Sequence, residues 1–594
     1  TGPVTINVRD GEYQDQFSIS DITGNSFVNT LTIQGESGDS SLVILRDDNN
    51  TTNHLVTFNN IKGLTVKDMT FNEYSYNDDN YCFNVVNCDT VNITNCRFHS
   101  YYNSDGSGSV RSNMKFAVKG SRGCVVQNSD FTLTSTLKIL RDNIDLDLRI
   151  INNIDIDHHN AIIDFHNVDN SLSGNIKCVY LRNSFRAPRS DYNSRIFYVH
   201  LNTDARTDTV ILEDNIFDFS NSISNTYTSS WFYCDHRNTN DYLLLRGNTF
   251  INAGRLNVGN VDIVGNRFVG NENTNVLSVE GDTRRDVLIV NNYIQVGGVL
   301  ETRAISFISN YVASGGVIAH NSIENTGTGT AYGMYLTSTP TNLTVKNNIF
   351  SAKNGGVPLY VENVLTGMDW DYNCYYTTGN TIVKYNGTDY NSVAGFGAAM
   401  SSDANSLNVN PYFLSDTNLA TNQGQLKAGT PLAGVTTDIE GAVRANPPTI
   451  GAKEYAGCFN DAGINRIIHP TSPLSSNTNN IEVELINQGD NALSSVIIAW
   501  SVNDVVQTPY NWSGNIASQN TTNVTIATNH TFSGATNYNL KVWVENLNGN
   551  SDCNSNNDTA ILNNLTMPLN GLYTLGGVSP DFVSFSELAT VLNT

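Results

Sequence analysis

An eight-residue pattern recurs along the first 375 residues and limits the possible folds more than any other feature. Two apolar residues alternate with other residues, an Asn, Asp or Gly follows, and an aromatic or aliphatic residue closes the pattern. It occurs at 64–71, 91–98, 210–217, 243–250, 261–268, 287–294, 305–312 and 343–350, and more loosely at 368–375. Each copy predicts a short strand, a turn with left-handed backbone and a second short strand. One such unit cannot bury its apolar face alone, so the repeats predict a stacked solenoid.

Stacking in register places equivalent residues of successive units above one another. The closing residues are then expected to point inward in aligned rows: Phe71, Phe98, Phe217, Phe250, Phe268 and Phe350. Asn should lie over Asn at the bends, where side-chain amides can hydrogen-bond along the row. The closing Phe residues are 27, 33 and 18 residues apart in three of the intervals, so surplus residues should leave the stack as loops.

Other all-β and repeat architectures fit this pattern less well. A β-sandwich would show turn signals at regular intervals of roughly 8–12 residues, without the repeated aromatic ending. Leucine-rich repeats would need a Leu framework, which is absent. We therefore expect an all-β chain whose residues 1–455 form a parallel β-helix.

A different pattern begins at Cys458. Apolar and polar residues alternate at 481–487, 496–502, 524–526 and 538–544, with turn residues between these runs. This predicts an immunoglobulin-like β-sandwich over 456–567. Cys458 and Cys553 flank it and could form one disulfide. The other cysteines fit a stacked solenoid interior as small apolar residues: Cys82, Cys88, Cys96, Cys124, Cys178, Cys234 and Cys374.

Residues 568–594 predict a linker and a short amphipathic helix, expected from about Ser579 to Asn593. Ser584 is a candidate N-cap with Glu587 as its capping-box partner. The apolar face is formed by Phe582, Phe585, Leu588 and Leu592, whereas the strand Val4, Ile6 and Val8 has no cap before it. We expect this helix to cover the first coil of the next copy, so that the chain is one period of a head-to-tail array or fibre. The alternative is a helix that lies on its own domain.

The end of the solenoid carries a second signature. Residues 438–444 read Asp-Ile-Glu-Gly-Ala-Val-Arg, and a Pro pair precedes Ile450-Gly-Ala-Lys-Glu454. This resembles the terminal motif of secreted bacterial right-handed β-helix proteins. With the Ile-x-Val-x-Leu and Ile-x-Trp-x-Val runs of the sandwich, nearly the whole chain resembles the giant tandem-repeat adhesins and fibre proteins of Bacteroidota. The resemblance implies a right-handed helix and a non-enzymatic, extracellular cell-surface protein that contacts its own copies and surface glycans.

Composition excludes some partners. The net charge of −23 opposes binding to nucleic acid, and no apolar run approaches the ~20 residues of a membrane span. We therefore expect neither a nucleic-acid partner nor membrane insertion.

The competing interpretation is a secreted carbohydrate-active β-helix, such as a polysaccharide lyase or a glycan-binding protein. Its best candidates are Asp145 and Asp147 on one strand with Asp155 and Asp157 on an adjacent coil, four carboxylates that could hold a structural Ca²⁺. The alternative, an ordinary polar outer face, is favoured. We expect no cofactor and name no catalytic residue.

Overall fold

The structure is a computed structural model that divides into two compact units. The first contains 1–411, 416–420 and 426–454, and the second contains 412–415, 421–425 and 455–594. It describes residues 2–47, 55–73, 83–100, 115–132, 136–140, 145–156, 163–164, 175–186, 197–201, 208–218, 220, 232–236, 242–252, 256–258, 261–270, 275–279, 286–307, 315–457, 459–474, 476–533, 537–566 and 574–592.

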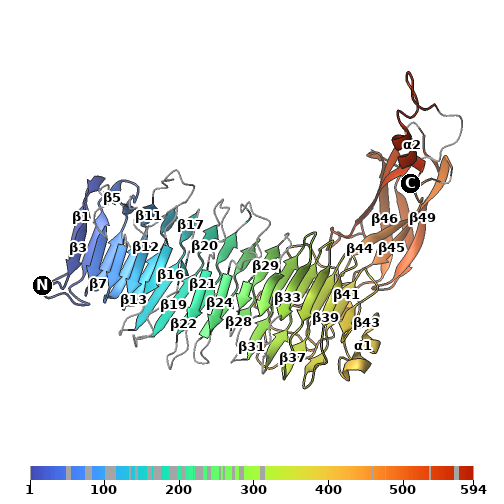
Figure 1. Ribbon diagram of the computed structural model, residues 1–594. Coiled ribbons are helices and arrows are strands. Elements are labelled where there is room, and N and C mark those ends of the chain that lie inside the picture. Colours follow the sequence, from blue (N-terminus) through green and yellow to red (C-terminus); the bar gives the residue numbers. More distant parts are fainter. Residues whose placement is uncertain are drawn as a thin grey trace. The chain divides into compact units, whose positions relative to one another are not determined.

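The first unit is a parallel β-helix in which the described strands form fourteen coils, built from three sheets that run the length of the stack (Figure 1). Sheet A contains β1 Val4–Val8, β4 Leu31–Gly35, β7 Lys62–Lys67, β10 Asp89–Thr94, β13 Arg122–Gln127, β16 Leu146–Ile151, β19 Ile176–Leu181, β22 Thr209–Glu213, β25 Tyr242–Arg246, β28 Val261–Val264, β31 Val287–Val290, β34 Gly316–Ala319, β37 Leu343–Lys346 and β40 Asp369–Asp371.

Sheets B and C complete each coil. Sheet B contains β2 Gly11–Gln14, β5 Val43–Asp47, β8 Thr70–Glu73, β11 Arg97–Ser100, β14 Asp130–Thr132, β17 Ile154–Ile156, β20 Ser184–Arg186, β23 Ile216–Asp218, β26 Thr249–Ile251, β29 Arg267–Gly270, β32 Tyr293–Val296, β35 Ser322–Asn325, β38 Ile349–Ala352 and β41 Cys374–Thr377. Sheet C contains β3 Phe17–Ser20, β6 Val56–Asn59, β9 Phe83–Val86, β12 Lys115–Lys119, β15 Thr136–Leu140, β18 Ile163–Asp164, β21 Phe197–Leu201, β24 Phe232–His236, β27 Leu256–Val258, β30 Asn275–Val279, β33 Thr302–Phe307, β36 Ala331–Leu336, β39 Val357–Val361, β42 Val383–Tyr385 and the antiparallel β43 Thr388–Tyr390.

The predicted aromatic row is present. All six closing Phe residues are buried. Phe217 stacks on Phe250 with ring centroids 4.8 Å apart, and Phe250 stacks on Phe268 at the same spacing. The row is interrupted between Phe131 and Phe185, where the strand register places the backbone of Asp155.

The predicted amide row is also present, and it forms a ladder of nine buried Asn residues: Asn153, Asn183, Asn215, Asn248, Asn266, Asn292, Asn321, Asn348 and Asn373. Each Oδ1 after the first accepts from both the backbone N–H and the Nδ2 of the previous Asn, as Asn248 does from Asn215 at 2.9 Å. The preceding residue is the one with left-handed backbone, for example Asp214 at φ 54°. Each turn therefore uses two consecutive residues. The first adopts the left-handed backbone, and the Asn that follows makes the ladder hydrogen bonds.

The first part of the predicted unit at 305–312 was assigned to the wrong sheet. Ile305 lies in β33 of sheet C and pairs with Met334, whereas the next turn from sheet A to sheet B lies at His320 and Asn321. Residues 308–312 lie outside the described residues. Alternating apolar residues also occur in sheet C strands, so the pattern alone did not identify the sheet. The pattern was not recognised in the coils that contain β13, β16 and β19. In these coils Cys occupies an apolar position, Arg occupies the turn position or Asp155 occupies the closing position.

The coils end well before residue 455. Helix α1 Val393–Met400 follows β43, and its Phe396 is fully buried against Tyr375 and Tyr385. The Ser392 hydroxyl caps the helix by accepting from the Gly395 N–H at 3.2 Å. The helix therefore covers the apolar interior at this end of the stack. Between α1 and β44, the described residues form only the one-turn 3₁₀ helix η1 Gly424–Leu426 and isolated bridges.

The second unit contains two antiparallel sheets that enclose one apolar core, the expected sandwich. One sheet contains β44 Ala462–His469, β45 Thr478–Asn487 and β49 Thr521–Thr531. The other contains β46 Leu493–Val502, β47 Val505–Val506, β48 Tyr510–Ile516, β50 Asn537–Glu545 and β51 Thr559–Thr566. The apolar residues of the alternating runs face inward, with Val483, Ile498 and Val542 buried. Helix α2 Phe585–Leu592 follows near the C-terminus.

Candidate functional site

The first coil leaves one edge of all three sheets unpaired among the described residues. Strand β1 pairs with β4, β2 with β5 and β3 with β6, each on one side. Val4 and Ile6 are 53% and 45% exposed, whereas Val8 is partly buried against the core. Apolar side chains and free backbone hydrogen-bonding groups therefore lie together at this end. Such an edge is a template for pairing with another chain.

Helix α2 has the expected cap but a shorter extent. The Ser584 Oγ accepts from the Glu587 N–H at 3.2 Å, and Glu587 Oε2 accepts from the Val583 N–H at 2.7 Å. The helix starts at Phe585, several residues later than predicted. The local reason is a turn in which Asp581 Oδ2 accepts from the Thr574 N–H and hydroxyl.

The apolar face of this segment differs from the expectation in one residue. Phe582 precedes the helix, pairs with Leu575 in an isolated bridge and is buried within the chain, so it offers little surface to a neighbour. Phe585 is 78% exposed and Leu588 is half-buried. The side chain of Leu592 lies outside the described residues. Phe585 and Leu588 are therefore the apolar side chains that a neighbouring surface could reach.

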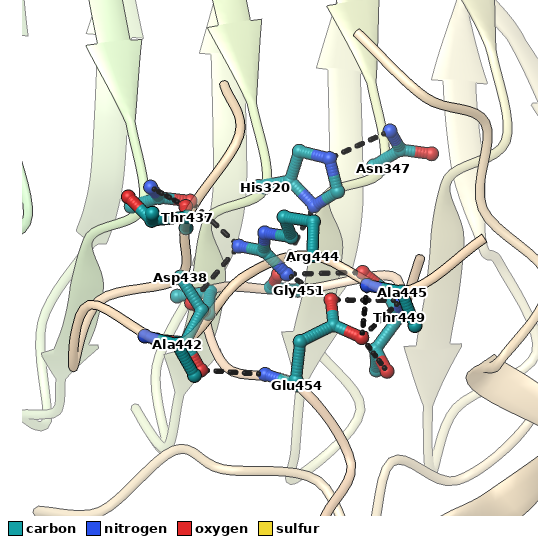
Figure 2. Close-up of polar contacts among 12 residues, drawn as sticks. His320, Asn347, Thr437, Asp438, Ala442, Arg444, Ala445, Thr449, Gly451 and Glu454 are labelled. Carbon is teal, nitrogen blue, oxygen red and sulfur yellow. Dashed lines mark hydrogen bonds and ion pairs between the residues drawn. The ribbon is translucent and has the colours of Figure 1, made fainter. Parts of the chain in front are cut away.

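The terminal motif of the solenoid forms a buried polar clasp around Arg444 (Figure 2). The Arg444 guanidinium donates to Glu454 Oε1 at 2.8 Å and to the Ala452 carbonyl at 3.0 Å. Glu454 also accepts from the Thr449 N–H, and the Asp438 carboxylate accepts from the Glu454 and Ala442 N–H groups. The Arg444 and Glu454 side chains are 5% and 14% exposed, so their ion pair is almost enclosed, while Asp438 binds backbone N–H groups, and together they fix a loop.

The clasp also attaches 426–454, here called the strap, to three successive coils. Arg444 donates to Asn291 Oδ1 at 2.6 Å, and Asn347 exchanges hydrogen bonds with the Thr430 backbone. Between them, His320 Nδ1 lies 3.3 Å from the Gly451 carbonyl, and its Nε2 lies 2.9 Å from Asn347 Nδ2.

These contacts define the protonation of the His320 ring. Nδ1 faces an acceptor and Nε2 faces an amide donor, so the neutral ring with the proton on Nδ1 fits both. Burial, and then the nearby Arg444 charge, lower the pKa of His320 to about 3. The three turn positions 291, 320 and 347 thus serve as attachment points of the strap. Asn291, His320 and Asn347 themselves occupy the left-handed turn position of the repeat, a signal that the sequence carried but that did not reveal the contact.

Of the four carboxylates considered for a lyase or calcium site, Asp145, Asp147 and Asp155 belong to one coil. Asp145 and Asp147 flank the start of β16 in sheet A, and the strand alternates as expected, with Leu146 and Leu148 buried. Asp145 pairs with Arg122 at 3.3 Å. Asp155 belongs to β17 in sheet B of the same coil, so the expected neighbouring-coil arrangement was wrong. The Asp155 side chain and the whole of Asp157 lie outside the described residues.

A carboxylate group that we did not predict lies in the sandwich. Asp461 precedes β44 and is fully buried, and one of its oxygens lies within 4.8 Å of an Asp552 oxygen. Burial raises the pKa of Asp461 and of Asp558 to about 7. Asp552 to Asp558 read Asp-Cys-Asn-Ser-Asn-Asn-Asp, a spacing of oxygen side chains that could have indicated the site. Cys553 beside it is disulfide-bonded, and its expected partner Cys458 lies outside the described residues.

A scan against protein-family models finds no match, and a search of curated proteins finds no significant one. None of the helices in the described part of the chain is long and apolar enough to cross a membrane. The functional conclusion therefore depends on the geometry of this chain alone.

Proposed function

We propose that this chain is a structural unit of an extracellular fibre in which copies join head to tail. In each junction, helix α2 of one copy covers the first coil, β1 to β3, of a neighbour. The observation that carries the proposal is the exposed apolar edge of that coil. Val4 and Ile6 are exposed there, beside strands that have partners on one side only.

Helix α2 has suitable dimensions and chemistry for this role. Its eight residues span about 12 Å, and the five residues of β1 span about 17 Å. A helix satisfies its own backbone hydrogen bonds and offers no strand edge, so it can cover the apolar interior without extending the sheets. Phe585 supplies a large exposed aromatic ring for the contact. Helix α1 covers the opposite end of the same stack with Phe396 in this way.

The junction would join two different surfaces of the chain. Such heterologous contacts generate an open array, because no symmetry closes them. The disulfide at Cys553 favours an oxidising compartment, which agrees with an extracellular location.

The test uses two complementary variants of the full chain. Ile6→Lys places a charge on the coil edge, and Phe585→Asp places one on the helix. Each variant alone should be monomeric in sedimentation velocity. An equimolar mixture should form discrete dimers and nothing longer, because one intact junction remains possible between the two proteins. The matched controls, Val299→Lys and Val578→Asp, alter exposed residues away from the strand and the helix, and both should still form filaments.

Two results would count against the proposal. If Ile6→Lys stops assembly and Phe585→Asp does not, the first coils pair with each other instead of with α2. If a chain of two copies joined from Thr594 to Thr1 shows no protection of 4–8 from hydrogen exchange at the internal junction, the helix does not cover the coil. Electron micrographs of the same samples would distinguish linear filaments from irregular aggregates.

A further inference from the structure

The strap shows how this solenoid holds a peptide segment at the corner between sheets A and B. Asn347, at the left-handed turn position, accepts from the Thr430 N–H at 2.9 Å and donates to the Thr430 carbonyl at 2.7 Å. Its Nδ2 also contacts His320 on the preceding coil at 2.9 Å. Asn291 likewise donates to the Thr437 carbonyl at 2.8 Å. A side-chain amide at this turn position therefore pairs with peptide groups of a segment that lies across the coils.

The same amide arrangement recurs nearer the N-terminus, at Asn128 and Asn152. Both residues occupy the left-handed position of the turn after sheet A, with φ of 50° and 52°, and both are exposed. Asn152 Nδ2 donates to Asn128 Oδ1 on the preceding coil at 3.4 Å, in the direction in which Asn347 contacts His320. Among the described residues, Asn152 Oδ1 has no donor, whereas the same atom of Asn347 accepts from the strap.

Apolar side chains lie beside the turn in both places. Under the strap, Val290 and Ala319 form a cluster with Val435 that is separate from the solenoid core. On β16 and β19, Ile151 and Leu181 are paired in register, directly precede the turn residue and are half-buried. Neither belongs to the cluster that the strap covers. This part of sheet A thus combines the amide and the apolar residues that hold the strap elsewhere.

Two exposed cations adjoin this apolar pair. Arg149 lies two residues before Ile151, and Arg182 directly follows Leu181. Among the described residues neither cation forms an ion pair, although the chain has 56 acidic residues and only 33 basic ones. The carboxylate of Asp214, on the coil after Arg182, lies against the turn glycine of the following coil. Exposed cations without counter-charges favour an anionic ligand.

From this correspondence we propose that the outer face of sheet A at β16 and β19 binds an acidic peptide segment of another protein, in the manner of the strap. Peptide groups of the ligand would pair with the Asn152 amide. Its apolar side chains would cover Ile151 and Leu181, and its carboxylates would pair with Arg149 and Arg182. An anionic polysaccharide would satisfy the cations alone. This site does not depend on the junction proposed above, because the first coil and α2 take no part in it.

A labelled peptide with the sequence of residues 428–440 is the probe. It contains the strap backbone that pairs with Asn347 and Asn291, the apolar Leu432 and Val435, and two carboxylates. Fluorescence anisotropy with the full chain should saturate at one peptide per chain, with a Kd below about 1 mM. Binding should weaken as NaCl rises from about 50 to about 500 mM, because salt screens exposed charge pairs. A lack of binding up to about 1 mM peptide would overturn the proposal.

Hydrogen exchange of the unaltered chain locates the bound peptide. Exchange should slow in 145–152 and 175–182 when the peptide is added. Slower exchange confined to 287–296 and 316–325 would mean that the peptide enters the position of the strap, and would overturn the proposal.

Substitutions separate a specific surface from a general charge effect. Arg149→Glu/Arg182→Glu should weaken peptide binding at least about tenfold. Asn152→Gly keeps the left-handed turn, removes only the amide and should weaken binding about threefold or more. The matched control Lys384→Glu/Arg466→Glu makes the same change in net charge at exposed cations elsewhere and should bind like the unaltered chain. Equal weakening by the two charge-reversing double variants would overturn the proposal.

Two other occupants are distinguished by the same exchange measurement. If polygalacturonate slows exchange in 145–152 and 175–182 and the peptide does not, the surface binds acidic polysaccharide. If these segments become protected as the concentration of the chain alone rises, a second copy covers them. Either result would overturn the assignment to an acidic peptide.

Discussion

The buried Asn ladder should fail locally when one member is removed, and Asn248 is the best position to test it. Its Nδ2 donates to the Leu212 carbonyl at 2.8 Å and to Asn266 Oδ1 at 3.0 Å. Its Oδ1 accepts from the backbone N–H and the Nδ2 of Asn215. Asn248→Ala removes all four bonds in a position with no solvent access.

The expected loss of local stability follows from the polar groups that lose their hydrogen-bond partners. The Asn215 N–H and the Leu212 carbonyl lose the bonds that the Asn248 side chain provided. Each enclosed polar group without a partner costs about 1–3 kcal/mol, so Asn248→Ala should lower local stability by about 3–5 kcal/mol. Asn248→Ser should cost less. Ser129 occupies the equivalent position nearer the N-terminus, where its Oγ accepts from the Cys96 N–H at 3.1 Å and donates to the Gln127 carbonyl.

Hydrogen exchange with mass spectrometry measures this coil by coil. A solenoid coil contacts mainly its neighbours, so the loss should concentrate in 208–218, 242–252 and 261–270. A cost of 3 kcal/mol corresponds to an exchange rate about 10² times higher. Unchanged protection in these three segments, or the same loss for Ala and Ser, would refute the view that ladder hydrogen bonds stabilise the turn.

Three further predictions concern the core and the clasp. Phe217→Ala should cost about 3–5 kcal/mol in chemical denaturation, whereas Ala at its exposed neighbour Ile216 should cost far less; equal costs would contradict the inward row. Arg444→Ala should cost about 3–5 kcal/mol by leaving Glu454 enclosed without a partner and should make the strap sensitive to protease, while Arg466→Ala at an exposed pair should cost below about 1 kcal/mol. Burial and Arg444 lower the pKa of His320 to about 3 in the fold, so its stability contribution is complete above about pH 6.5 and is lost as the pH falls toward 3. At pH 4.5 the loss should be about 2–3 kcal/mol, and His320→Asn, which copies the Asn of the neighbouring coils, should remove this part of the pH dependence in parallel unfolding titrations.

Sequence periodicity predicted the solenoid well because its main determinants are local. A strand, a left-handed turn and an inward aromatic residue fall within eight residues, so Phe217, Phe250 and Phe268 could be aligned without any contact information. The same locality explains the error at Ile305. Sheet C strands alternate in the same way, and only long-range register decides which sheet a strand joins.

Contacts between distant segments could not be derived from such patterns. The strap meets Asn291, His320 and Asn347 across 83 to 153 residues of chain. The Asp461 group likewise joins residues about 96 positions apart. In both cases the participating side chains are ordinary turn or loop residues in the sequence. These side chains come into contact because of the positions at which the coils and the sandwich strands end.

The two ends of the solenoid differ in a way that bears on assembly. At the C-terminal end the last ladder residue, Asn373, donates its N–H to Ser406 Oγ at 2.7 Å, Asp403 accepts from Ser406, and Phe396 of α1 covers the core. Hydrogen bonds and apolar surface are thus both satisfied within the chain. At the first coil, Val4 and Ile6 remain exposed beside one-sided strands. In the proposed junction, α2 of a neighbouring copy would supply to the first coil the kind of cover that α1 supplies to the last, and such a contact between two different surfaces is heterologous.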